Sequence, residues 1–81
     1  MADNVNHPAH YNTGEIEVIK YIQDKLGYDG FVGYLNGNIL KYISRWQFKN
    51  GLEDLRKAQW YLNYMINYIS DYKDMTEIIN E

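Results

Sequence analysis

The segment from Leu52 to Tyr72 constrains the fold of this chain most strongly. It contains no glycine or proline, and its apolar residues recur at intervals of three and four, which is typical of an amphipathic helix. One stripe is aliphatic, and a second, aromatic stripe lies roughly 130° away on a helical wheel. A helix that is apolar on two faces needs two neighbours. The aliphatic stripe consists of Leu52, Leu55, Leu62, Ile66 and Ile69, and the aromatic stripe of Trp60, Tyr61, Tyr64 and Tyr68.

Two further helices are predicted upstream of this segment. The first should run from about Glu15 to Leu26, because Asn12 and Glu15 resemble a capping box and isoleucines follow at helical spacing. The glycines of residues 27–30 should end it. The second should start near Phe31 and carry a stripe of Leu35, Ile39, Tyr42, Ile43 and Trp46.

Glycines divide these elements further. Gly33 and Gly37 are poor helix formers, so the first half of the second helix is expected to be broken or to start later. Residues 49–51, Lys-Asn-Gly, predict a turn that folds the second and third helices into a helical hairpin.

We therefore expect an all-α fold, a small three- to four-helix domain over residues 1–81. Residues 1–14 should form an N-terminal arm, and residues 73–81 a weak helix or tail. The first two helices should cover the aliphatic stripe, which leaves the aromatic face for another subunit, the arm or a ligand. Because the chain has 81 residues and no cysteine, its core is thin, and a homo-oligomer is expected.

The net charge of −3 argues against general nucleic-acid binding, which depends on neutralising phosphates with lysine and arginine. The N-terminus lacks the basic and apolar regions of a signal peptide. No apolar run approaches the roughly 18 residues of a membrane span. A soluble, cytoplasmic protein with no membrane partner is expected.

Positive charge is concentrated near the predicted hairpin turn. Lys41, Arg45 and Lys49 fall at i, i+4 and i+8 and form one row at the border of the apolar stripe, with Asn38 on the same side. Lys57 follows after the turn. One interpretation is a set of solvated ion pairs, such as Glu53 with Lys57 and Lys49 with Asp54. The other is a phosphate or carboxylate site with Arg45 as its bidentate anchor. Spacing alone slightly favours the ion pairs.

A second motif, "HPAHY", spans His7 to Tyr11. Its histidines could share a metal with carboxylates from elsewhere, could belong to a loop docked on the helices, or could contact phosphate and carry a proton. The docked loop is favoured over the metal. The sequence contains neither of the standard glycine-rich phosphate cradles, so a nucleotide would have to be held by helices, basic side chains and stacked aromatic rings.

The stretches "HPAHY", "GEIEVIKYI" and "GNILKYISRWQFKNGLEDLRKAQWYL" resemble the small phage-encoded nucleotide kinase-like proteins, over about Asn6 to Met65. This resemblance implies a phage origin, the cytoplasm of the host cell, and a nucleotide-binding protein linked to phosphorylation of deoxynucleoside monophosphates. The matching positions are His7, His10, Tyr11, Asn38, Lys41, Arg45, Lys49, Asn50, Asp54 and Lys57.

The resemblance to nucleotide kinase-like proteins implies a role for each of the candidate site residues. Phosphate would be bound by Asn38, Lys41, Arg45, Lys49 and Lys57. His10 and Asp54 would be catalytic, and Glu53 with Asp54 could hold Mg²⁺. The residues expected to stack on the base or to belong to the loop are His7, Tyr11, Trp46 and Tyr61. The alternatives are a non-catalytic phage protein that sequesters a nucleotide signal or inhibits a host protein, and a structural oligomer with a solvated charged turn.

Overall fold

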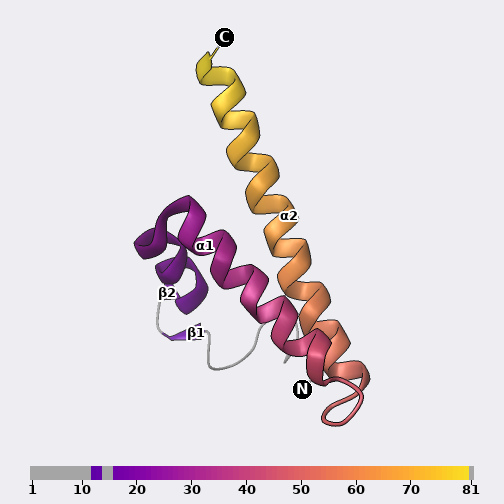
Figure 1. Cartoon of the computed structure of the whole chain (residues 1–81). Helices are drawn as coiled ribbons and strands as arrows, with labels where there is room; N and C mark the ends of the chain where they lie inside the picture. The colour runs from indigo at the N-terminus through magenta and orange to yellow at the C-terminus, as the bar shows by residue number, and fades with distance from the viewer. Residues whose placement is uncertain (1–11, 14–15, 81) are drawn as a thin grey trace.

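The computed structural model describes the backbone of residues 12–13 and 16–80, and side chains over residues 17–75 (Figure 1). Two short strands, β1 (Asn12–Thr13) and β2 (Ile16–Glu17), pair in antiparallel register. Two long helices follow, α1 (Val18–Arg45) and α2 (Leu52–Asn80). The predicted all-α class is confirmed. The predicted N-terminal arm lies almost entirely outside the described residues.

The helix α1 joins the first two predicted helices into one element with a bend at Gly27. This residue has φ 72° and ψ −176°, a conformation open essentially to glycine alone. The predicted break over residues 27–30 is therefore reduced to a single residue. Helix resumes at once because the Tyr28 ring packs against Tyr68 and Tyr72 of α2, with centroids 5.7 and 4.1 Å away.

The expected break near Gly33 and Gly37 is wrong, because α1 is helical through both glycines. Phe31 and Leu35 on the same stretch are completely buried. Their packing outweighs the unfavourable helix propensity of the glycines, which amounts to about 1 kcal/mol each.

The start of the first helix also differs from the prediction. Asn12 lies in β1 opposite Glu17, so it does not cap a helix. The helix begins at Val18, and Glu17 precedes it in an extended conformation without a side-chain cap. Glu15, the other half of the expected capping box, lies outside the described residues.

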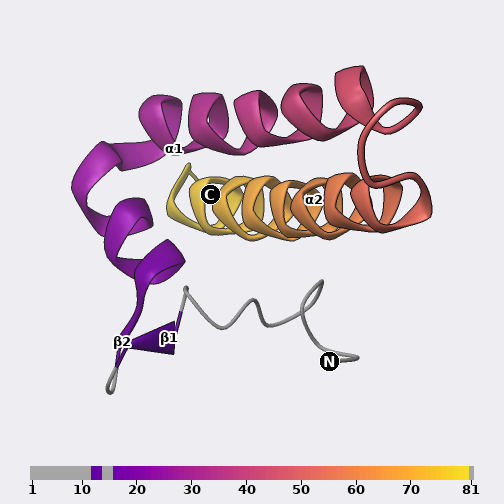
Figure 2. The same cartoon turned by 90° about the horizontal axis from the view of Figure 1, so that it is seen from below.

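The second arm of α1, residues 28–45, packs against α2 as the predicted helical hairpin (Figure 2). Phe31 lies at the centre of the interface, with its ring 5.8 Å from Tyr64 and 4.9 Å from Tyr68. Tyr61 is buried and Tyr64 is half-buried, with its hydroxyl donating to Gln23 Oε1 at 2.9 Å. Aromatic rings thus fill the space between the helices.

The expected use of the two α2 stripes is therefore reversed. The aromatic stripe faces α1, whereas Leu52, Leu62 and Ile66 of the aliphatic stripe are 60%, 44% and 54% exposed. Rings bury more area per residue than aliphatic side chains, and tyrosine hydroxyls can find partners at the edge of the interface. The hairpin gains more by covering its rings.

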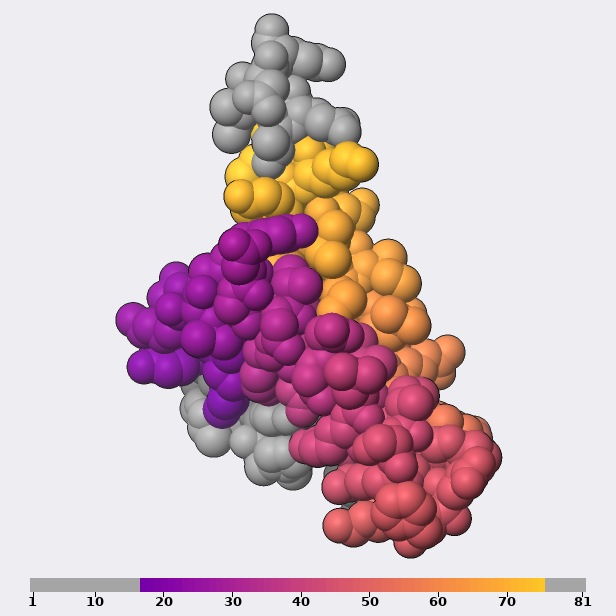
Figure 3. Space-filling view, in the orientation of Figure 1, coloured from indigo at the N-terminus to yellow at the C-terminus, as the bar shows by residue number. Residues whose placement is uncertain are grey.

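The helix α2 continues to Asn80, so the segment predicted as a weak helix or tail is the end of a long helix. Its yellow end projects beyond α1 in Figure 3. Tyr72 and Met75, near this end, are exposed.

Replacing two glycines with alanine should have opposite effects. A Cβ at Gly27 or Gly33 would meet no atom within 4 Å, so crowding affects neither variant. Gly27→Ala should lower the free energy of unfolding by about 1–3 kcal/mol, because it forces φ 72° on a residue with a Cβ. Gly33→Ala should raise it by about 0.5–1 kcal/mol through helix propensity. Urea denaturation measures both, and equal signs would contradict the assigned bend.

Candidate functional site

A buried carboxylate ties the two helices together at the hairpin turn. Asp54, in the first turn of α2, has 0% exposed surface. Its Oδ2 accepts hydrogen bonds from Arg45 Nε and the backbone N–H of Asn50, both at 3.2 Å. Its Oδ1 accepts from Arg45 Nη2 at 3.3 Å and Asn50 Nδ2 at 3.2 Å. We call these three residues the clasp, because they join the end of α1, the turn and the start of α2.

The local sequence explains how the clasp forms. Gly51 adopts φ 58°, and its N–H donates to the carbonyl of Trp46 at 2.8 Å, which closes the turn. The position of Asp54 in the first turn of α2 also places its charge near the positive end of the helix dipole. The turn favours glycine at position 51 because of its positive φ, and Asn50 supplies two of the hydrogen bonds to Asp54. The helix α2 begins at the next residue, Leu52.

The clasp shifts the acidity of Asp54. Burial raises the pKa of the carboxyl group, but the hydrogen bonds from the Arg45 side chain and from Asn50, with the Arg45 charge, bring the pKa below its ordinary value of 3.8. The carboxylate is therefore charged at neutral pH. All four donors to it come from Arg45 and Asn50.

Three cations converge on the ring of Tyr42, one turn before the clasp. Lys41 Nζ lies 4.7 Å, Arg45 Cζ 4.8 Å and Lys57 Nζ 5.5 Å from the ring centroid. The Tyr42 ring is buried and stacks on Tyr61 with centroids 6.0 Å apart, so the aromatic interface holds the ring in place. We call Lys41, Arg45, Lys57 and Tyr42 the cation cluster.

The cation cluster carries more positive charge than its protein surroundings neutralise. Arg45 is paired with Asp54. Within the described residues, neither Lys41 nor Lys57 forms an ion pair with a carboxylate. The three cations and the single carboxylate leave a local charge of about +2. The attraction of each cation to the ring contributes roughly 0.5–2 kcal/mol, but it does not neutralise the charge. Such a site can hold an anion.

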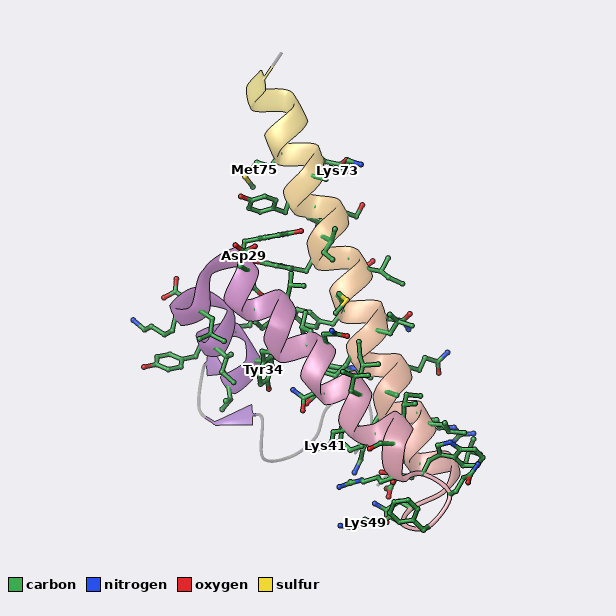
Figure 4. All side chains as sticks on the ribbon, in the orientation of Figure 1. Asp29, Tyr34, Lys41, Lys49, Lys73 and Met75 are labelled. Atoms are coloured by element: carbon green, nitrogen blue, oxygen red, sulfur yellow. The ribbon has the colours of Figure 1, made fainter. Side chains whose placement is uncertain are left out.

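The predicted row of cations is only partly correct. Because α1 ends at Arg45, Lys49 lies in the exposed turn of residues 46–51 and does not continue the row. Figure 4 shows Lys41 and Lys49 at the same end of the hairpin. The described contacts bring Lys57 to the ring in place of Lys49. The expected ion pair of Lys49 with Asp54 is not formed, because Arg45 occupies that carboxylate.

The remaining predicted site residues lie elsewhere. Asn38 donates from Nδ2 to the carbonyl of Tyr34 at 2.9 Å on its own helix. Trp46 is half-buried at the end of α1. Tyr61 lies behind Tyr42 inside the aromatic interface. His7, His10 and Tyr11 lie outside the described residues.

The described residues do not fit the expected Mg²⁺ at Glu53 and Asp54. Glu53 is exposed, whereas Asp54 is buried and its oxygens accept four hydrogen bonds. Neighbouring helical positions also point about 100° apart, so the two carboxylates cannot face one ion. In the part of the chain that the structure describes, no three His, Cys, Asp or Glu residues gather as a metal site.

Tyr42 is the site residue that the sequence analysis assigned only to the core. Arg45, at i+3, gave a signal, because it lies on the same helix face as Tyr42. Lys41 directly precedes Tyr42 in the chain and reaches the ring with its long side chain. Lys57 was predicted to bind phosphate, but nothing in the sequence indicated its approach to the Tyr42 ring, which depends on the hairpin geometry that the clasp fixes.

The fold and the site define a small helical hairpin with a basic cluster beside its turn. In comparisons with known proteins, the DUF3310 family, described as a protein of unknown function, matches residues 5–63, and the chain belongs to this family. The Gene 1.7 protein of Enterobacteria phage T3 is 40% identical over 66 residues. The match covers 75% of this chain but only 40% of that relative. No solved structure matches the chain.

The expected membership of a nucleotide kinase-like family is wrong. The matching family has no assigned function, and the name of the phage T3 relative states no activity. The findings support a phage protein of unknown function. Among the described residues, neither helix is long and apolar enough to cross a membrane.

Removing the Asp54 charge should destabilise the hairpin in a pH-dependent way. The pKa of Asp54 is lower in the folded protein than its ordinary value of 3.8. The Asp54 carboxylate therefore stabilises the folded protein fully above pH 3.8, and this stabilisation is lost as the pH falls through the pKa that Asp54 has in the folded protein. Asp54→Asn should lower the melting temperature at pH 7 by roughly 10 °C or more. The difference from the unmodified protein should shrink between about pH 5 and 2.

Glu53→Gln is the matched control, because Glu53 is the exposed neighbour of Asp54. Its melting temperature should stay within about 2 °C of the unmodified protein at neutral pH. Similar losses in both variants would show that general charge, and not the clasp, sets the effect.

Proposed function

We propose that this phage protein binds a phosphate-bearing small molecule at the cation cluster. The observation that carries the proposal is the convergence of Lys41, Arg45 and Lys57 on one buried ring, where among the described residues only Arg45 is paired with a carboxylate. Phosphate offers the charge that this cluster lacks. We place this role in the cytoplasm of the infected host.

Arg45 is suited to orient such a ligand. Its guanidinium has five N–H donors, and the Asp54 carboxylate takes one from Nε and one from Nη2. The other three donate to no protein acceptor among the described residues and are open to phosphate oxygens. Because the clasp already holds the guanidinium, little conformational freedom of Arg45 is lost on binding.

The lysines complement this planar donor. Lys41 and Lys57 come from different helices and supply point charges on either side of the hairpin interface. Arg45 is only 24% exposed, so its attraction to an anion is screened less than in open water. Deoxynucleotides are the ligands to test first, with inorganic phosphate as the minimal probe.

Binding without chemistry is the function that the geometry supports best. Asp54, the expected catalytic carboxylate, is fully engaged in the clasp, and its lowered pKa makes it a poor general base. The proposal therefore favours a protein that sequesters its ligand over a phosphotransferase.

Single lysine changes should weaken ligand binding. Calorimetric titration with phosphate, deoxynucleoside monophosphates and triphosphates should show at least about tenfold weaker binding for Lys57→Gln and for Lys41→Gln, since each removes a charged contact. Lys49→Gln is the control, and its affinity should change by less than about threefold. Binding should also weaken as salt is added.

Three results would contradict the proposal. No heat of binding with any of these ligands would exclude the site, as would equal losses for Lys49→Gln and Lys57→Gln. Turnover of a nucleotide, detected by product analysis after the titration, would replace sequestration with an enzymatic function.

A further inference from the structure

One face of the hairpin exposes a largely aliphatic surface, whose groove is also lined by Arg56 and Gln59. A groove of about 440 Å³ runs between the two helices on this side. Ile43 and Leu52, which line it, are 49% and 60% exposed. We call this surface the aliphatic face. It consists of Ile39 and Ile43 of α1 with Leu52, Leu55, Leu62 and Ile66 of α2.

The spacing of these residues on α2 is that of a coiled-coil seam. From Leu52 to Lys73 the positions advance alternately by three and by four residues, which is the heptad pattern that packs one helix against another. The seam is apolar except for one glutamine and the final lysine. Its members are Leu52, Leu55, Gln59, Leu62, Ile66, Ile69 and Lys73.

We propose that a second copy of this chain covers the aliphatic face, with the two α2 helices antiparallel. In this arrangement Leu52 faces Ile69 of the other copy, Leu55 faces Ile66, and Gln59 faces Leu62. The two residue numbers in each facing pair add to the same sum. One two-fold axis therefore relates the two copies in every one of these contacts. The groove beside the seam then receives apolar side chains of the second copy.

Charge on the seam selects this direction. A parallel pair would place the two Lys73 ammonium groups against each other at the end of the seam. The antiparallel pair leaves Lys73 beyond the last apolar layer, near the turn of the other copy. Figure 4 shows Lys73 toward the far end of α2 from the turn, as this requires. Phe48, 79% exposed in that turn, is a suitable surface for its methylene stem.

The solvent-exposed area of the chain is consistent with a second copy covering the aliphatic face. The chain exposes 5961 Å². A compact monomer of 9.7 kDa exposes about 5,100 Å². The excess of about 900 Å² is close to the roughly 800 Å² that one partner buries in a standard protein interface.

The dimer contact is separate from the proposed anion site. Lys57 lies roughly 170° around α2 from the centre of the seam, so the two cation clusters of a dimer would face outward. Loss of the dimer and loss of anion binding can therefore be distinguished by different variants.

Neighbouring charge insertions on α2 test the dimer. Sedimentation equilibrium of the full chain should show a dimer, and Ile66→Glu should weaken its association at least hundredfold, because each dimer then buries two carboxylates. Asn67→Glu adds the same charge one position away, outside the seam, and should leave the association within about threefold. Circular dichroism should show unchanged helix content in both, since Ile66 is 54% exposed.

Crosslinking tests the direction of the helices. The chain has no cysteine, so single cysteines report without background. Asn63 and Ser70 lie on the same flank of the seam, one heptad apart. In the antiparallel pair the two copies of residue 63 are offset by roughly 8 Å along the axis, and those of residue 70 by roughly 28 Å. A short bis-maleimide should join Asn63→Cys into dimers and leave Ser70→Cys uncrosslinked.

The proposal is overturned if the unmodified chain stays monomeric up to millimolar concentration. It is equally overturned if Ile66→Glu and Asn67→Glu associate alike, or if Ser70→Cys crosslinks as readily as Asn63→Cys.

Discussion

The buried carboxylate of Asp54 is the interaction on which the rest of this structure depends. It accepts hydrogen bonds from Arg45 at the end of α1 and from Asn50 in the turn, so it fixes how the two helices meet. A charge with no exposed surface is costly unless it is paired and hydrogen-bonded, and here both conditions hold. The same contacts hold the Arg45 guanidinium beside Tyr42. Fold and candidate site are therefore set by one group of side chains.

Much of the fold could be predicted from the sequence. Periodicity identified helices and the Asn-Gly turn identified the hairpin, because both signals are local. The glycines of residues 27–30 indicated a break, but propensity could not show that helix resumes directly after Gly27 or stays intact at Gly33, since the packing of Tyr28, Phe31 and Leu35 decided both. The choice between the two stripes of α2 also depends on packing against α1, which no local pattern contains.

The candidate site was predicted only in part, because local sequence patterns do not contain the packing between the two helices. Lys41 and Arg45 are close in sequence and were found by their spacing. Lys57 was found by its position after the turn, but only the hairpin geometry brings it to the Tyr42 ring. Asp54 was given a catalytic role because the family resemblance implied one. The structure shows it accepting four hydrogen bonds that join the turn to the two helices, which local sequence patterns did not indicate.

The central claim is that the clasp assembles a cation cluster that binds phosphate. The most direct measurement is an NMR titration with inorganic phosphate that follows the Tyr42 ring, the Lys41 and Lys57 ammonium groups, and Arg45 Nε. The account predicts that these signals shift together and saturate at one ligand per chain. Shifts confined to lysines outside the cluster, such as Lys20 and Lys25, or shifts that grow without saturation, would contradict it.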